Sequence, residues 1–243
     1  MSFAFFQETL LTLLPGVPLT LELAFLSTAI GAVLAVTLAL MRLSGVLPLD
    51  YFARAYVFAF RGTPLLVQIF LIYYGLSQFP AVRQSVFWPV LREPFWCAII
   101  ALSLNTGAYG SEVVRGGLLS VPHGQVEAAR AVGMSGLLLF RRIVLPQAIR
   151  QALPAYGTEL ILMVKATSLA SIITLMEITG RAAKLISDTY RVIEVFVVAG
   201  AIYLIINFVL TRIILALEFW LTPHLRERPE ARELPADSAG EHA

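Results

Sequence analysis

The chain has 243 residues, of which 58% are hydrophobic and only 14% are charged. Soluble domains are about 45–50% apolar and about 25% charged, so this composition excludes an ordinary soluble domain and indicates an integral membrane protein. A net charge of +2 gives no reason to expect nucleic acid as a partner. One cysteine and three scattered histidines argue against a disulfide framework or a metal site.

The chain begins with a short apolar stretch, and we predict that residues 1–16 form an interfacial segment. Pro15 and Gly16 separate this stretch from the long apolar run that follows. A cleaved signal peptide is not expected, because neither a basic n-region nor a small-residue cleavage site accompanies the stretch.

Residues 17–220 are predicted to form an all-α transmembrane domain with five membrane-spanning helices. A helix needs roughly 20 mostly apolar residues to cross about 30 Å of hydrocarbon. Charged residues bound five such stretches, at 17–41, 62–82, 94–111, 151–176 and 195–211, the last extended towards residue 220. Residues 221–243 are polar and proline-containing, which predicts a disordered tail.

The distribution of Lys and Arg predicts that the N-terminus is outside and the C-terminus is inside. Positive residues favour the cytoplasmic side of a membrane protein. This orientation places twelve arginines in inner segments and five basic residues in outer ones, with Lys165 within the membrane. The inner arginines, among them Arg54 and Arg61, are interpreted as topology signals that contact phospholipid.

The connection at about residues 119–150 has the organisation of two helices rather than of a simple loop. Residues 125–132 are good helix formers, Gly133 interrupts them, and Pro146 is expected to end the second helix. An apolar helical pair outside the bilayer needs a partner surface. Either another protein or the ends of the chain's own spans could supply that surface.

This connection resembles the EAA loop of the permeases of binding-protein-dependent ABC importers. Seven residues match the EAA loop at its fixed spacing: Glu127, Ala128, Ala129, Gly133, Ile143, Leu145 and Pro146. The likeness extends to residues 61–68 and 103–109, which are similar to polar amino acid permeases. Residues 153–156 and 187–190 most resemble the M-type subunit of histidine, lysine/arginine/ornithine and opine permeases.

The resemblance implies that the EAA loop forms coupling helices seated in a groove of a cytoplasmic ATPase subunit. Glu127 would contact the ATPase, Ala128 and Ala129 would allow close approach, and Gly133 would make the turn. Alternatively, Glu127 is a solvated charge and Gly133 a helix C-cap. The chain has no phosphate-binding loop, so ATP and Mg²⁺ are expected on a partner ATPase dimer, with no cofactor and no catalytic residue in this chain.

The same resemblance points to a translocation path within the membrane. Glu159 aligns with an acidic position that contributes to a substrate site in related permeases, although a structural salt bridge is the alternative. The resemblance also favours Ser103, Asn105, Thr106 and Thr167 as path residues, with interhelical hydrogen bonds as the alternative. Many relatives have Asp or Asn where this chain has Ala166, which puts a symmetric site in doubt.

We therefore predict a permease subunit of an ATP-driven importer in the bacterial inner membrane. Its implied substrates are polar amino acids, with basic amino acids (arginine, lysine, ornithine, histidine) or opines favoured. Its implied partners are the ATPase dimer, an extracytoplasmic amino acid binding protein, the lipid bilayer, and a second permease subunit that is either Q-type or another copy. The alternatives are an ATP-independent secondary transporter or channel, and an intramembrane enzyme that uses Ser168 and Lys165.

Overall fold

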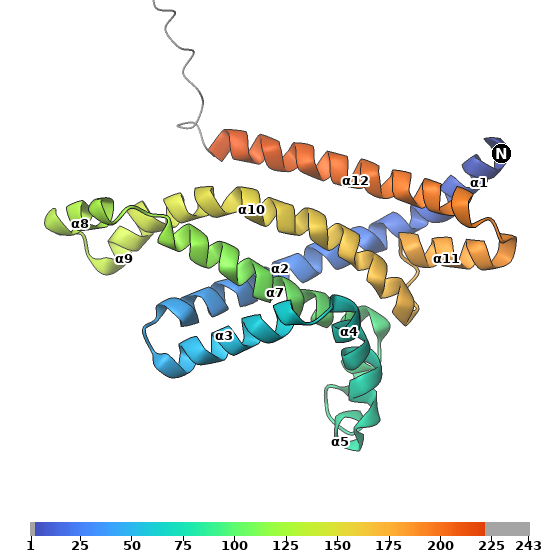
Figure 1. The fold of residues 1–243 in the computed structure, drawn as a ribbon, viewed down its shortest axis with the longest axis horizontal. Coiled ribbons are helices and arrows are strands. Elements are labelled where there is room, and N and C mark those ends of the chain that lie inside the picture. The colour runs from blue at the N-terminus through green and yellow to red at the C-terminus, as the bar shows by residue number, and fades with distance from the viewer. Residues whose placement is uncertain (1–2, 222–243) are drawn as a thin grey trace, which may run out of the picture.

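The computed structural model describes residues 3–221, and within that range the chain is helical with no strand (Figure 1). The all-α prediction is confirmed for this range, while the predicted tail lies, from residue 222 onward, outside the described residues. The α-helices are α1 (Phe3–Leu13), α2 (Val17–Leu43), α3 (Leu47–Gly62), α4 (Leu65–Phe70), α5 (Pro80–Arg83), α6 (Trp88–Leu91), α7 (Pro94–Leu119), α8 (His123–Ala131), α9 (Gly136–Leu139), α10 (Leu145–Ala166), α11 (Ile178–Thr189) and α12 (Val192–Leu221). Short 3-10 turns cover Leu14–Gly16, Leu76–Gln78 and Thr167–Ile173, and π-helical turns cover Leu71–Gly75 and Phe140–Val144.

Three continuous helical stretches are long and apolar enough to cross a membrane, at Ala4–Leu43, Gly136–Ile173 and Val192–Leu221. A bent pair of helices makes a fourth candidate. The central helix α7 is not among them, because Asn105 and several glycines and serines lower its hydropathy. Residues of α7 are instead buried against other helices of the chain.

The first stretch includes the segment that was predicted to be separate. α1 continues into α2 through the single 3-10 turn at Leu14–Gly16, and Leu13, Gly16 and Val17 have right-handed helical backbone angles. Pro15 is tolerated there because it occupies the first turn of a helical segment, where its missing N–H has no partner to lose.

The second predicted span, at residues 62–82, coincides with the second half of a bent pair of helices rather than with one straight helix. Helix starts at Leu47 rather than Gly62, and it bends by 104° between α3 and α4. Pro64 disfavours helical angles at the residue before it, and Thr63 is extended, with φ −115° and ψ 143°. The sequence Gly-Thr-Pro therefore lies at the break within a bent pair of helices.

Pro146 does not end the second helix of the 119–150 connection, contrary to the prediction. α9 runs through the π-helical turn Phe140–Val144 directly into α10, and this stretch continues to Ile173. Pro146 lies in the first turn of α10. The π turn shifts the hydrogen-bond register just before the proline, so that the helix continues despite the missing donor.

The core of the molecule is the contact between α2 and α7, which pack along most of their length. Small residues make this close approach possible. A Cβ added to Gly31 would lie 2.7 Å from the Thr106 side chain, and one added to Gly107 would lie 2.9 Å from Leu34 Cβ. α10 packs on α7 and α12 packs on α10, so that the other long helices build on this pair.

A buried carboxylate ties together the elements opposite the α8–α9 end of the molecule. Glu177 is fully buried and accepts hydrogen bonds from the backbone N–H groups of Thr179 and Gly180, at 3.0 and 2.8 Å. The Tyr203 hydroxyl donates to it at 2.7 Å. Burial raises the pKa of Glu177, while these hydrogen bonds oppose the rise. The carboxylate thus fixes the start of α11 against α12.

We expect Tyr203→Phe to lower the stability of the protein by about 1 kcal/mol, because it removes a hydrogen bond from a buried acceptor. The midpoint of thermal unfolding of the purified protein in detergent measures this change. Tyr190→Phe is the matched control, since Tyr190 is 88% exposed. Equal midpoints for the two variants would contradict the role assigned to Tyr203.

Candidate functional site

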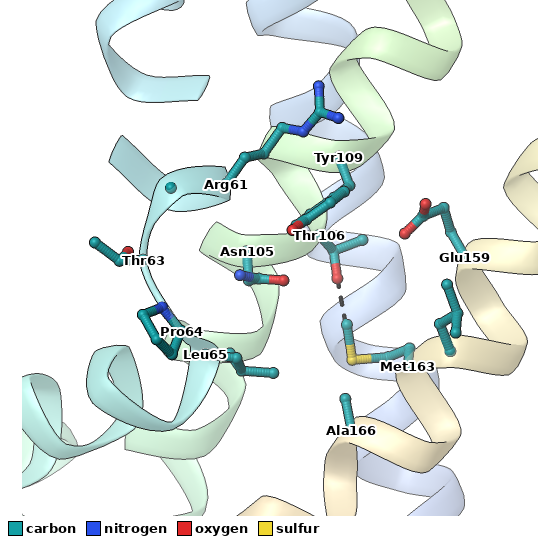
Figure 2. A pocket seen from close by; sticks show the side chains of 12 residues that line it. Arg61, Thr63, Pro64, Leu65, Asn105, Thr106, Tyr109, Glu159, Met163 and Ala166 are labelled. Carbon is teal, nitrogen blue, oxygen red and sulfur yellow. Dashed lines mark hydrogen bonds between the residues drawn. The ribbon is translucent and has the colours of Figure 1, made fainter. Parts of the chain in front are cut away.

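A cavity of about 530 Å³ opens between the end of α3, α7 and α10 (Figure 2). Its size is within the usual range of small-molecule sites, about 300–1,000 Å³. The lining combines apolar side chains with two opposite charges and several hydrogen-bonding groups. The lining residues are Arg61, Gly62, Thr63, Pro64, Leu65, Asn105, Thr106, Tyr109, Glu159, Leu162, Met163 and Ala166.

The break between α3 and α4 forms one wall of the cavity, and a buried glutamine holds it in place. Gln68 Nε2 donates to the carbonyl oxygens of Phe60 and Thr63 and to Thr63 Oγ1, at 2.8, 3.1 and 2.9 Å. These bonds satisfy acceptors that the end of α3 leaves without helical partners. Such irregular backbone at membrane depth is tolerated where it is buried in protein or lines a water-filled cavity.

Asn105 joins this wall to α7. Its Nδ2 donates to Gln68 Oε1 at 3.1 Å, which fixes the orientation of the amide. Figure 2 shows the Asn105 oxygen on the cavity side. The side chain therefore presents a hydrogen-bond acceptor to whatever occupies the cavity.

Two opposite charges face the cavity from different helices. Arg61 comes from the end of α3 and stacks over the Tyr109 ring, 5.1 Å from the ring centroid, while Glu159 comes from α10. Among residues 3–221, neither makes an ion pair. Unpaired charges at membrane depth are costly. This arrangement suits a ligand that carries both an anionic and a cationic group.

Three of the five predicted path residues line the cavity, namely Asn105, Thr106 and Glu159. Ser103 lies at the α2–α7 contact and is 2% exposed. Thr167 is fully buried, and its Oγ1 donates to the Val164 carbonyl oxygen at 2.7 Å. The structure therefore brings three of the five together and holds the other two in the packing around them.

Arg61, Tyr109 and Met163 line the same cavity although sequence reasoning did not select them. Arg61 was interpreted as a topology signal because it was placed at the boundary of a span. The Gly-Thr-Pro sequence that follows Arg61 is the signal that could have identified it. A break in a helix at this sequence places the end of α3, and with it Arg61, beside a cavity inside the protein. Ala166 lies in the wall and contributes no charge.

The lysine and serine of α10 and the following 3-10 turn do not form a catalytic pair. Ser168 Oγ donates to the backbone carbonyl of Lys165 at 2.7 Å, and Lys165 is exposed. Within residues 3–221 there is also no cluster of three or more His, Cys, Asp or Glu that could hold a metal ion.

The EAA-like residues lie at one end of the molecule, where α8 and α9 project beyond the long helices (Figure 1). Glu127 and Ala128 are exposed and Ala129 is 5% exposed. Gly133 has φ +80°, a left-handed conformation that favours glycine. Ile143 and Pro146 are half-buried in the turn leading into α10, and Leu145 is at the exposed margin.

Several apolar side chains at this end are exposed and are not buried by other described residues of the chain. Val132 is 76% exposed and Leu137 is 79% exposed. These residues flank the Gly133 turn, in a segment that also carries exposed charges. An exposed apolar patch rimmed by polar residues is typical of a protein contact surface.

Comparison with known proteins gives consistent matches over nearly the whole chain. Residues 27–223 match the family described as "Binding-protein-dependent transport system inner membrane component". The Octopine transport system permease protein OccM of Rhizobium meliloti is 62% identical, over 98% of this chain and 96% of that protein. The Histidine/lysine/arginine/ornithine transport system permease protein HisM of Escherichia coli K12 is 41% identical, over 80% and 82%. A crystal structure of an amino acid ABC transporter with histidines is 34% identical, with a TM-score of 0.80 over 90% of this chain and 98% of that one.

Proposed function

Since this chain belongs to the family of binding-protein-dependent transport system inner membrane components and is an ABC transporter permease, we propose that it carries arginine-derived opines or basic amino acids into the cell. The observation that supports this proposal is the pair of unpaired charges, Arg61 and Glu159, facing one cavity. Arg61 would hold a carboxylate of the solute. Glu159, aided by the oxygen of Asn105, would hold its guanidinium or ammonium group.

The names of the relatives agree with this chemistry. OccM is an octopine permease and HisM a permease for histidine, lysine, arginine and ornithine. Octopine and arginine share a guanidinium at one end and a carboxylate at the other. Charge-assisted hydrogen bonds to both ends would orient such a solute across the cavity. We therefore propose that the translocation path passes Asn105, Thr106 and Glu159. Ser103 and Thr167 would stabilise the helix packing around it.

We propose five spans, formed by α2, the α3–α4 pair, α7, α10 and α12, with the N-terminus outside. α7 has 26 residues, which at 1.5 Å per residue gives about 39 Å, enough to cross the bilayer. Residues 1–16 would lie at the outer interface, residues 17–220 would form the permease domain, and residues 221–243 would form a cytoplasmic tail. The protein would reside in the bacterial inner membrane.

The partners proposed for this permease follow from its family and from its exposed end. The α8–α9 pair would dock on an ATPase, with contacts from Glu127, Ala128 and the apolar residues beside Gly133. The conformation of the α8–α9 pair would be stabilised by the other four EAA-like residues, Ala129, Ile143, Leu145 and Pro146. ATP and Mg²⁺ would be bound by the ATPase dimer. A second permease, Q-type or another copy, would complete the path, and an extracytoplasmic binding protein would deliver the solute.

The test is uptake of labelled arginine and octopine by proteoliposomes that contain this chain with its ATPase, second permease and binding protein. Uptake that requires lumenal ATP, and that competition with lysine or unlabelled octopine lowers, is the expected result. Uptake without ATP would instead support a secondary transporter or channel. ATP-dependent uptake of neither solute would overturn the substrate proposal.

Docking by the α8–α9 pair predicts that Leu137→Asp reduces recovery of the ATPase with the permease by about fivefold or more. Burying a leucine side chain in an interface contributes about 1.5–3 kcal/mol, and an aspartate there adds a desolvation cost. Co-purification from detergent, with the ATPase quantified per permease, measures the effect. Val86→Asp is the matched control, because Val86 is 83% exposed, close to the 79% of Leu137, and lies in the connection between α5 and α6. Equal ATPase recovery for both variants would place the docking surface elsewhere.

A further inference from the structure

A second cavity, of about 470 Å³, adjoins the first on the far side of Arg61 and Tyr109. Both side chains line both cavities, and so does Gly62. Figure 2 shows the Arg61 guanidinium on the side of the first cavity opposite Ala166. The stacked pair of Arg61 and Tyr109 therefore forms part of a wall that the two cavities share.

The second cavity is strongly cationic. Arg42 from the last turn of α2 and Arg54 from α3 line it together with Arg61. Arg54 Nε donates to Asp50 Oδ1 at 2.8 Å, and Arg42 pairs with Glu112, which also binds Arg115 at 2.8 Å. Three guanidinium groups thus line the cavity, and their two carboxylate partners, one of them shared with Arg115, leave an excess of positive charge. The excess positive charge favours an anionic ligand.

The arginines differ in what they can do for such a ligand. The Arg42 side chain is 14% exposed and is held between helices by Glu112, whereas that of Arg54 is 61% exposed. Among the described residues, the Arg61 guanidinium stacks over the Tyr109 ring and forms no ion pair. An incoming carboxylate can therefore be bound by Arg61 and Arg54 without breaking the ion pair that joins α2 to α7.

The second cavity lies towards one end of the molecule. Arg42 and Arg54 lie beside the α2–α3 connection, which is at the same end of the molecule as α8 and α9 (Figure 1). Under the proposed function this is the cytoplasmic end. The first cavity therefore leads into the second on the way to the cytoplasm.

We propose that the second cavity is an exit site that receives the carboxylate of the transported solute from the first cavity. Arg61 binds the carboxylate in the first cavity. Its side chain then moves past Tyr109 with the bound solute, and Arg61 and Arg54 together bind the carboxylate in the second cavity. The guanidinium or ammonium group of the solute leaves Glu159 in the same movement. This inference rests on the proposed function, and its ligand is a solute carboxylate rather than a lipid phosphate.

The experiment places a cysteine in the exit site and asks whether the solute shields it. Phe58 lines the second cavity and is 81% exposed, so Phe58→Cys should react with a small anionic methanethiosulfonate reagent. The native Cys97 is fully buried and provides an unreactive background. The complex with its ATPase and second permease is used in nanodiscs without nucleotide.

We expect millimolar arginine or octopine to slow the modification of Phe58→Cys at least threefold. Agmatine, which is arginine without its carboxylate, should give no protection. Adding Arg54→Gln should abolish the protection by arginine. Tyr51→Cys is the matched control, since Tyr51 is 67% exposed on the same helix but does not line the cavity, and its modification should be unaffected by arginine.

The other outcomes overturn the inference in distinguishable ways. Equal rates with and without arginine, in a complex that shows ATP-dependent uptake, would remove the exit site and leave the proposed function standing. Shielding that depends on phosphatidylglycerol in the nanodisc, and not on arginine, would assign the cavity to a lipid headgroup. Absence of ATP-dependent uptake of both solutes would overturn the exit site together with the proposed function.

Discussion

Glu159→Gln is expected to reduce ATP-dependent uptake of arginine at least tenfold. A tenfold loss corresponds to about 1.4 kcal/mol, and a hydrogen bond to a charged group contributes about 1.5–3 kcal/mol. Glutamine keeps the size of the side chain and removes its charge, so the cavity would retain its shape and lose its attraction for a guanidinium. Uptake at several arginine concentrations, in proteoliposomes with lumenal ATP, measures the change.

Three controls separate a binding defect from a folding defect. Basal ATPase activity of the complex should be unchanged, because Glu159 is remote from α8 and α9. Glu93→Gln, which neutralises a 54% exposed side chain outside the cavity, should leave uptake unchanged. Glu159→Asp keeps the charge and should retain more uptake than Glu159→Gln. Full uptake by Glu159→Gln would make Glu159 a structural residue. It would also contradict the proposal that Glu159 binds the cationic group of the solute.

Gly117→Ala is expected to destabilise the protein by about 3 kcal/mol, the upper end of the usual cost of overpacking. A Cβ at this position would lie 2.7 Å from the Ala148 carbonyl oxygen and 3.0 Å from Ala152 Cβ. The nearest obstacle is backbone, which cannot rotate away, so α7 and α10 would have to separate. Thermal unfolding of the purified complex and its yield from membranes measure the effect.

The neighbouring residue supplies the matched control. Gly116 is in the same turn of the same helix, and a Cβ added there meets nothing within 4 Å. Gly116→Ala should be neutral or stabilising by up to about 1 kcal/mol, because alanine has the higher helix propensity. If both variants unfolded at the same temperature, the close approach of α7 and α10 would not contribute to stability.

The sequence was sufficient for the features that depend on local patterns. Apolar stretches bounded by charges identified a helical membrane protein, and the residues from Glu127 to Pro146 identified the loop and its family. The turn at Gly133 could be predicted because a left-handed position favours glycine. Asn105, Thr106 and Glu159 are polar groups within apolar stretches, and the resemblance to related permeases is what selected them as path residues.

The sequence was insufficient where packing between distant segments decides the structure. The partners of Gln68 and Asn105 come from residues 37 apart or from the end of α3, and no pattern of spacing reveals them. An arginine such as Arg61 looks the same in the sequence whether it bounds a span or ends a helix at a break. Only the bend between α3 and α4 shows that it ends a helix at a break. Likewise, the sequence predicted a span at residues 94–111 but not that α7 is the most enclosed of the long helices, because that enclosure depends on contacts with other helices of the chain.

The close fit of α2 and α7 has a mechanical consequence. Helices whose glycines lie against side chains of the partner helix cannot slide along each other without collisions, so this pair should behave as a single rigid body. Any opening and closing of the path must therefore occur at segments attached to it, such as the break at Thr63 and the π turn before α10. Spin labels on α2 and α7 would then keep one distance through the whole ATPase cycle, while labels on α7 and on α9, which is joined to α10 through the π turn, would report two.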